Sequence, residues 1–218
     1  ASADFASNEL KSGDTSLWKI QGNGTIALDT TTDDHYVTMS GDGSKRWSHN
    51  TFDITTIAEG TYIMEFDAAF TWTSGQPSEF SIVSKANQAE RSFGSGQSVL
   101  DTQAQVFIML QDATDFTKWV LYSNGEETTT SATITSGAWY HFKLELTKAN
   151  SKNRTGYVTI TGDSGGLERT AFSCKDNQSE TANYISYSIG RVAHGLKVNN
   201  IVTYGEKSDN VYIYVHGL

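Results

Sequence analysis

Two carboxylates in the segment YIMEFDAAF, Glu65 and Asp67, stand two positions apart. Successive side chains of a strand point to opposite faces, so both carboxylates would lie on one face and the apolar residues from Tyr62 to Phe70 on the other. A pair of carboxylates carries out glycoside hydrolysis, one as nucleophile or base and the other as acid. Two ordinary carboxylates on the solvated face of a sheet give the same pattern, and this is the interpretation that we favour.

Aromatic rings form the second group of residues with a chemistry of their own. Flat rings stack on the C–H faces of sugars, while amide and guanidinium groups fix the sugar hydroxyls by hydrogen bonds. Three of the five tryptophans lie at strand ends or beside polar neighbours, although Trp72 also continues the apolar face of its strand. With polar side chains near them in the sequence, they are the predicted sugar-binding residues: Trp47, Trp72, Trp119, Gln76, Arg91 and Gln111.

These side chains act together only if strands hold them, and the sequence predicts strands throughout. Apolar and polar residues alternate from Tyr140 to Thr147, the turn-forming run ANSKNRTG follows, and alternation resumes from Tyr157 to Thr161. This pattern is typical of an antiparallel hairpin with one face on a core. Similar segments recur along the chain, separated by turns rich in Gly, Ser and Asp. The sequence therefore predicts an all-β protein, a sandwich of two antiparallel sheets.

Length and charge limit the domain organisation and the partners. The chain has 218 residues, and we expect one sandwich over residues 1–205, with residues 206–218 as a last edge strand or the start of a linker. The net charge of -9 would repel a phosphate backbone, so nucleic acid is not an expected partner, and a neutral glycan fits better than a polyanionic one. No run approaches the ~20 apolar residues of a membrane span, so no membrane partner is expected.

The order of these segments carries a family resemblance over nearly the whole chain. The stretch from Gly137 to Glu145, GAWYHFKLE, and the closing strand with Val198–Ile201 resemble the concanavalin A-like (laminin G-like) jelly-roll modules of bacterial polysaccharide-degrading enzymes. The resemblance implies a jelly-roll sandwich. Many such modules are carbohydrate-binding modules, others are catalytic, and some have no known ligand. It also implies that Trp18 and Trp139 pack in the core or at the sandwich edge.

Catalytic members of this fold supply a test of Glu65 and Asp67. Family 16 glycoside hydrolases carry a third acid on the same strand, whereas the similar positions here are Ala69 and Phe70, which cannot donate a proton. Jelly-roll alginate lyases rely on an Arg-rich strand, a Gln-x-His strand and a Tyr-x-Lys-x-Gly-x-Tyr strand, which this sequence lacks. We therefore expect that the chain is not an enzyme.

The resemblance also implies a structural calcium ion. Related modules hold calcium between an acidic residue near the N-terminus and an Asp of the closing strand. Here Asp4 is present, but Asn199 replaces the usual Asp. Calcium prefers several oxygen ligands, many of them anionic. We expect that no cofactor is required, and that a structural calcium, if bound, uses Asp4, Asn199 and Asn200.

The function predicted from the sequence is non-catalytic carbohydrate binding. The chain would be a monomeric module of a larger, secreted, bacterial enzyme, and would hold that enzyme against a neutral plant cell-wall polysaccharide such as a β-glucan, xyloglucan, xylan or mannan. Two alternatives stay open at this point. One is a glycoside hydrolase or polysaccharide lyase domain that uses Glu65 and Asp67. The other is a structural or adhesin-like module without a sugar ligand.

Overall fold

The computed structural model describes most of the strands and a few of the connecting segments of the chain. The described residues are 19–22, 25–29, 31, 36–40, 47–53, 60–73, 77–85, 105–123, 126–148, 155–173, 184–190, 195–207 and 210–215. Within these ranges, some strand residues are described by their backbone alone. All the structural statements below refer to this part of the chain.

The described residues form fifteen β-strands and no helix, and the strand pairs are antiparallel. This confirms the all-β prediction. The strands are β1 (Lys19–Gly22), β2 (Thr25–Asp29), β3 (Tyr36–Ser40), β4 (Trp47–Asp53), β5 (Gly60–Thr71), β6 (Glu79–Lys85), β7 (Gln105–Gln111), β8 (Lys118–Ser123), β9 (Glu126–Thr133), β10 (Trp139–Lys148), β11 (Thr155–Gly162), β12 (Gly165–Ser173), β13 (Tyr184–Gly190), β14 (Gly195–Lys207) and β15 (Asn210–Val215).

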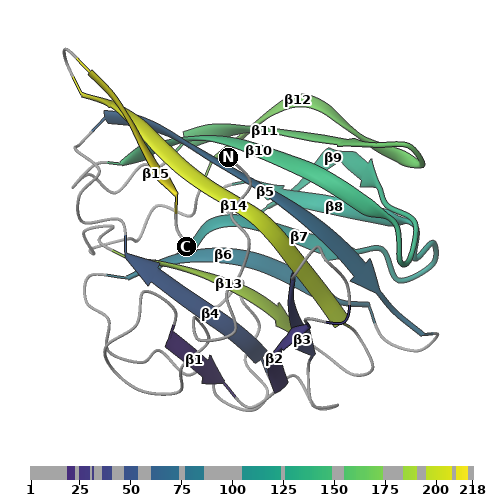
Figure 1. The fold of residues 1–218 in the computed structure, drawn as a ribbon. Helices are drawn as coiled ribbons and strands as arrows, with labels where there is room; N and C mark the ends of the chain where they lie inside the picture. Colours follow the sequence, from purple (N-terminus) through teal and green to yellow (C-terminus); the bar gives the residue numbers. More distant parts are fainter. Residues whose placement is uncertain are drawn as a thin grey trace.

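Hydrogen bonding connects the strands into one sheet that curls over to form two layers (Figure 1). One layer has the strand order β1-β4-β13-β6-β7-β8, and the other has the order β12-β11-β10-β5-β14-β3-β2. Strand β9 joins them, since it pairs with β8 along its length and with β12 at the single pair Gly166–Thr133. Strand β15, within the predicted C-terminal segment, pairs with β14.

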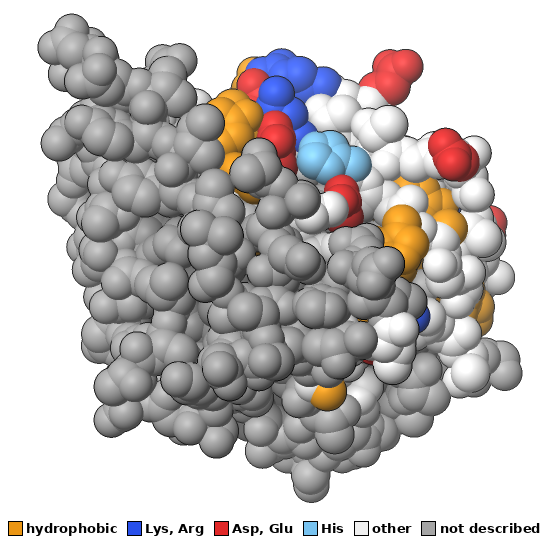
Figure 2. Space-filling model, viewed as in Figure 1, with side chains coloured by type: hydrophobic (Ala, Val, Ile, Leu, Met, Phe, Trp, Pro, Cys, Tyr) orange, Lys and Arg blue, Asp and Glu red, His pale blue; other side chains and the backbone are white. Residues whose placement is uncertain are grey.

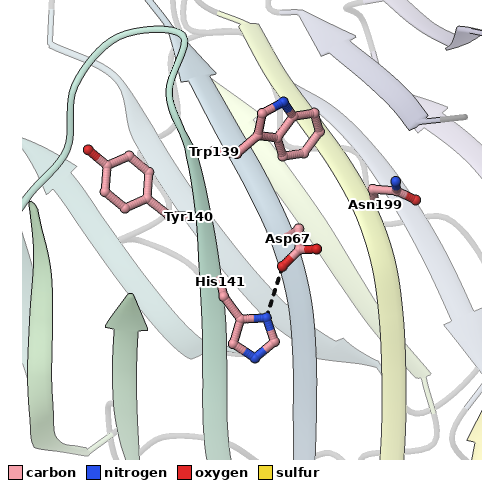
Figure 3. Close-up of a pocket in the computed structure, with 5 residues that line it drawn as sticks. All are labelled: Asp67, Trp139, Tyr140, His141 and Asn199. Atoms are coloured by element: carbon pink, nitrogen blue, oxygen red, sulfur yellow. Dashed lines mark hydrogen bonds and ion pairs between the residues drawn. The ribbon is translucent and has the colours of Figure 1, made fainter. Parts of the chain in front are cut away.

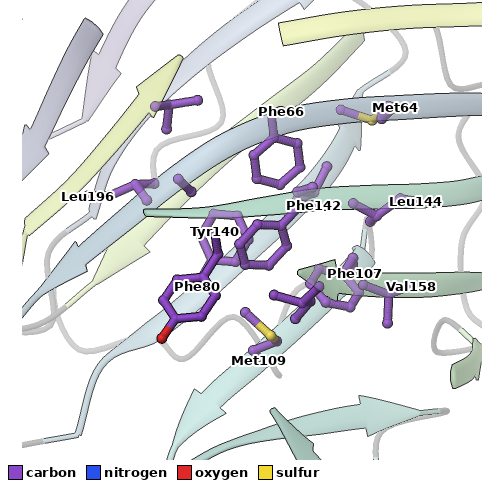
Figure 4. Close-up of a cluster of buried hydrophobic side chains, with 14 of the residues drawn as sticks. Met64, Phe66, Phe80, Phe107, Met109, Tyr140, Phe142, Leu144, Val158 and Leu196 are labelled. Atoms are coloured by element: carbon purple, nitrogen blue, oxygen red, sulfur yellow. The ribbon is translucent and has the colours of Figure 1, made fainter. Parts of the chain in front are cut away.

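An aromatic core lies between the two layers (Figure 4). Phe66 of β5 stacks on Phe142 of β10, with ring centroids 4.9 Å apart and an interplanar angle of 8°. From the opposite layer, Phe80 of β6 approaches both rings to 6.2 Å, and Phe107 of β7 meets Phe172 of β12 at 5.2 Å. Such ring pairs stabilise a core beyond the area that they bury. They show that the curled sheet is a sandwich.

In β5 and β10 buried and exposed residues alternate, and this alternation determines which side chains face outward. In β5 the even-numbered residues from Tyr62 to Phe70 are buried, and in β10 the even-numbered residues from Tyr140 to Leu146 are buried. The odd-numbered side chains of both strands therefore lie on the outer face of their layer. Register pairs His141 with Asp67 and Lys143 with Glu65 on this face.

Two local features shape the layer that carries this outer face. A tight turn joins β11 to β12, and Gly165 has a φ of 138° that side-chain-bearing residues rarely adopt. A β-bulge interrupts the pairing of β14 with β5 between Asn199 and Val202, and Asn200 within it has a φ of 51°. Asn tolerates this left-handed conformation better than most residues, and bulges re-aim side chains.

A search for helices long and apolar enough to cross a membrane finds none among the described residues.

Candidate functional site

A hollow of about 320 Å³ opens on the outer face of β5, β10 and β14 (Figure 3). Its volume is at the lower end of the ~300–1,000 Å³ typical of ligand pockets. The residues that line it are Asp67, Trp139, Tyr140, His141 and Asn199. Tyr140 is buried, on the other face of β10. The hollow therefore combines one indole ring with a carboxylate, an imidazole and an amide.

Strand pairing places β10, β5 and β14 side by side at the hollow. Trp139 on β10 is opposite Ala69 on β5, and Ala69 is opposite Lys197 on β14. Ala69 is buried and is not among the residues that line the hollow. One residue pair further along the strands, His141, Asp67 and Asn199 are aligned in the same way.

Trp139 is the ring that this hollow presents to solvent. Its exposed fraction is 40%, which contradicts the prediction that it packs in the core or at the sandwich edge. The indole meets Tyr36 of β3 edge-on, with centroids 5.7 Å apart. Tyr36 is itself held in place, because its hydroxyl donates to Asp29 Oδ2 at 2.9 Å and Lys197 Nζ lies 4.9 Å from its ring centroid.

Asp67 is the polar centre of the hollow. Its Oδ1 lies 2.8 Å from His141 Nδ1, and its Oδ2 accepts a hydrogen bond of 2.6 Å from Asn200 Nδ2. Since Asp67 accepts, His141 Nδ1 is the donor, and Nε2 of a neutral imidazole is left as an acceptor. The His141 side chain is 49% exposed, so solvent or a ligand can reach it.

The bulge of β14 supplies the amide groups. Asn199 is buried, and its Oδ1 accepts a hydrogen bond of 2.8 Å from the backbone N–H of Asn200. Asn200 Oδ1 is buried without a hydrogen-bond partner in the described structure, and such an acceptor is costly to leave unpaired. The bulge therefore brings the side-chain amide of Asn200 to the carboxylate of Asp67, while Asn199 lines the hollow.

The carboxylate beside Asp67 on the same strand, Glu65, has a different environment. Glu65 Oε1 accepts a hydrogen bond of 3.0 Å from the hydroxyl of Tyr204 on β14. Burial and this hydrogen bond raise the pKa of Tyr204 to about 12. The structure thus gives each carboxylate of the Glu65–Asp67 pair its own partners.

Two of the predicted sugar-binding residues lie in the interior. Trp119 is fully buried, with its ring 4.7 Å from that of Phe70, so a sugar has no face of it on which to stack. Gln111 is buried as well: its Oε1 accepts from Ser78 N at 3.0 Å, and its Nε2 donates to Phe116 O at 2.7 Å. These hydrogen bonds hold the β7–β8 connection.

The other predicted residues do not line the hollow in the described structure. Trp72 is half-buried against the core, with its ring 6.2 Å from that of Trp119. Trp47 begins β4, and its side chain lies outside the described residues, as do Gln76 and Arg91. A sugar-binding role for these three residues stays a prediction.

Sequence reasoning missed His141 and misplaced Trp139. The signal was present, because the alternation that buries Tyr140, Phe142 and Leu144 puts Trp139 and His141 together on the polar face. The family resemblance predicts a packed Trp139, whereas the alternation predicts an exposed one.

The described residues do not by themselves make up a calcium site. Asp4 lies outside them, and near Asn199 and Asn200 the only lining carboxylate is Asp67, both of whose oxygens already accept hydrogen bonds. Calcium takes six to eight oxygen ligands. No group of three or more His, Cys, Asp or Glu side chains suited to a metal occurs in the described part of the chain.

Solved structures share this architecture, whereas no protein-family model and no curated protein matches the sequence. The VIP36 exoplasmic/lumenal domain, in its Ca²⁺/Man3GlcNAc-bound form, aligns with a TM-score of 0.54 at 9% identity, over 89% of this chain and 87% of its own. An endo-β-1,4-glucuronan lyase from the fungus Trichoderma reesei aligns with a TM-score of 0.52 at 10% identity, over 97% of both chains. The fold is a concanavalin A-like jelly roll.

A third concanavalin A-like structure adds to the comparison. The marine PL-14 alginate lyase from Aplysia kurodai aligns with a TM-score of 0.51 at 9% identity, over 82% of this chain and 86% of its own. The two lyases contradict the prediction that the chain is not an enzyme, because enzymes that cleave polysaccharides share its concanavalin A-like fold. The jelly-roll prediction, in contrast, is confirmed.

Proposed function

We propose that the protein binds a polysaccharide in the hollow of β5, β10 and β14. The observation that carries this proposal is the exposed ring of Trp139 standing beside the hydrogen-bonded pair Asp67–His141. A sugar needs both a flat apolar surface and directional polar groups, and the hollow offers the two side by side. Support comes from the fold, since the VIP36 structure holds Man3GlcNAc.

In this proposal three of the residues that line the hollow have a part in recognition. The indole of Trp139 stacks on the C–H face of a pyranose ring, and the free Nε2 of His141 accepts from a hydroxyl group. Asp67 keeps the imidazole in the required orientation. Net gains from such hydrogen bonds are small because the sugar and the protein both give up water, so we expect dissociation constants in the micromolar to millimolar range.

The ligand that fits the charge of the chain best is a neutral glycan. A net charge of -9 disfavours long polyanions at low ionic strength. We therefore propose a neutral plant cell-wall polysaccharide, a β-glucan, xyloglucan, xylan or mannan, as the ligand class. The proposal includes secretion from a bacterium, as one module of a larger enzyme, with any structural calcium held by Asp4, Asn199 and Asn200.

Polysaccharide lysis is the second candidate function, and the Asp67–His141 pair favours it. A histidine held at Nδ1 by a carboxylate is a typical general base. In a β-elimination, His141 Nε2 would remove the proton from C5 of a uronate. The C4–O bond would break with the leaving oxygen taking up a proton from water, and a C4–C5 double bond would form. Lys197, beside Tyr36, supplies a positive charge for the uronate carboxylate.

Affinity gel electrophoresis against a panel of neutral and uronate-containing polysaccharides tests the proposed function. We expect retardation by at least one neutral glycan, and loss of that retardation in Asp67→Asn. Asp115→Asn is the matched control, because it removes the same charge from an exposed turn between β7 and β8. Retardation of the protein without cleavage of the glycan supports the binding function. Ultraviolet absorbance from new C4–C5 double bonds would establish the lyase, and the absence of both effects with every glycan would refute the proposal.

A further inference from the structure

A second exposed cluster lies on the same outer face as the hollow, towards the opposite end of β10. The guanidinium of Arg169 on β12 lies over the ring of Tyr157 on β11, with Cζ 3.4 Å from the ring centroid. Its Nε donates to Glu145 Oε2 at 2.7 Å, and its Nη2 donates to Glu145 Oε1 at 3.3 Å. Three neighbouring strands therefore fix one planar cation in place.

Strand β10 connects this cluster to the hollow. Trp139, His141, Lys143 and Glu145 lie on its outer face, and Glu145 is paired in register with Tyr157. Glu145 is six positions after Trp139, which is about 20 Å along a strand. That length matches several linked pyranose rings. Trp139 and Tyr157 are also the two large hydrophobic residues that the described structure exposes, each at 40%.

The charge of this face differs from that of the chain. Among the described side chains, four acids and three bases lie along it, a formal charge of -1, whereas the whole chain carries -9. In Figure 2 the pale blue histidine side chain lies among acidic and basic side chains, with hydrophobic ones on both sides. The described charged residues of the face are Asp29, Glu65, Asp67, Glu145, Lys143, Arg169 and Lys197. A hydrogen-bonding surface with so little net charge suits a neutral glycan.

We propose that this face is one continuous polysaccharide-binding strip that runs along β10, with a distal subsite at Tyr157 and Arg169. Its ligand is an extended glycan chain several sugar residues long, and not a monosaccharide or the tip of a branched glycan. The strip rests on the proposed function, since it extends the same site. Trp139 and His141 hold one end of the chain, and Arg169 donates hydrogen bonds to hydroxyl groups at the other end.

Preorganisation is what makes Arg169 suitable for this part. A free arginine side chain loses rotamer freedom when it binds, and this loss weakens binding. Arg169 has already given up that freedom, because Glu145 and Tyr157 hold it from two sides. The hydrogen bond to Glu145 also neutralises the guanidinium locally, so that it recognises hydroxyl groups without requiring an anionic ligand.

Binding as a function of ligand length tests the strip. Isothermal titration calorimetry would use cello-, xylo- and manno-oligosaccharides from disaccharide to hexasaccharide, with wild type, Arg169→Ala and Lys118→Ala. Lys118 is a matched control, since it is a cation of the other layer that bonds to Thr133. We expect the affinity of the wild type to rise with the length of the oligosaccharide. Arg169→Ala should weaken hexasaccharide binding about tenfold, because one charge-assisted hydrogen bond is lost. The same variant should bind the disaccharide as tightly as the wild type.

The outcomes separate the strip from the site on which it depends. Equal wild-type affinity for disaccharide and hexasaccharide, or an Arg169→Ala variant as tight as wild type on the hexasaccharide, would overturn the strip and leave the hollow as the site. Wild-type protein that binds none of these oligosaccharides would overturn the strip, and if no glycan retards it in electrophoresis either, the proposed function falls as well. Because Arg169→Ala could unfold locally, Arg169→Gln and a circular dichroism melt of each variant show whether the loss is one of binding.

Discussion

Replacing Trp139 by alanine removes the ring on which the proposed function depends, and the structure sets the size of the effect. An indole presents up to ~250 Å² of surface, and 40% of this residue is exposed, so about 100 Å² is open to a ligand. A sugar that covers one face removes about half of that from water, which at ~25 cal/mol/Å² is worth about 1.3 kcal/mol, or about tenfold in affinity.

The assay for Trp139→Ala is calorimetric titration with the glycan that retards the wild type most strongly. Trp139→Phe is the informative companion, because it keeps a ring and should recover part of the affinity. Trp139→Ala also removes the edge-on contact with Tyr36, so its melting temperature should fall, and binding must be measured well below that temperature. An alanine variant that is folded and binds as tightly as wild type would refute stacking on Trp139.

Three further outcomes follow from single contacts. Trp119→Phe should leave glycan binding unchanged and lower the free energy of unfolding, measured by urea titration, by less than about 1.5 kcal/mol. The buried Nε1 has no hydrogen-bond partner to lose. Trp119→Ala should lower the same free energy by ~3–5 kcal/mol. Gly165→Ala should destabilise the fold by about 1–3 kcal/mol, because φ is 138° and a Cβ would lie 2.5 Å from Thr133 O. An unchanged urea midpoint in this variant would contradict the predicted strain. The pKa of Tyr204, raised from 10.0 to about 12, means that the folded state holds the phenol proton more tightly than the unfolded state. The contribution of Tyr204 to the free energy of unfolding should therefore be full below pH 10.0 and fall as pH rises towards 12. Tyr204→Phe should remove this part of the loss of stability at alkaline pH.

The sequence was sufficient for the strands and for the polar face of β5. Alternation alone places Glu65 and Asp67 on one face and Phe66 on the other, and the structure has them so. Period-two patterning is a local property, so it can be read without knowing which strands pair.

The site itself depends on register, which is not local. Nothing in the sequence near Asp67 indicates that His141 and Asn199 are its neighbours, since these pairs form between strands far apart in the chain. Trp119 shows the opposite error: its polar sequence neighbours suggested exposure, but Lys118 and Val120 flank it on the other face of β8 while its ring packs on Phe70. Neighbours in sequence were a poor guide because adjacent strand residues face opposite ways.

The pairing of β5 with β14 has a consequence for how the protein folds. Asp67 and Asn200, which share a hydrogen bond in the hollow, are 133 positions apart. Contacts of such long range require a large loop to close before any stabilisation is gained, and proteins dominated by them fold in milliseconds to seconds, far more slowly than helical bundles. The β10–β11 hairpin can form early from local contacts, whereas the groups that surround Asp67 meet only when the closing strand docks. Because β14 also places Leu196, Val198 and Ile201 in the core, the site and the core are completed by the same long-range event.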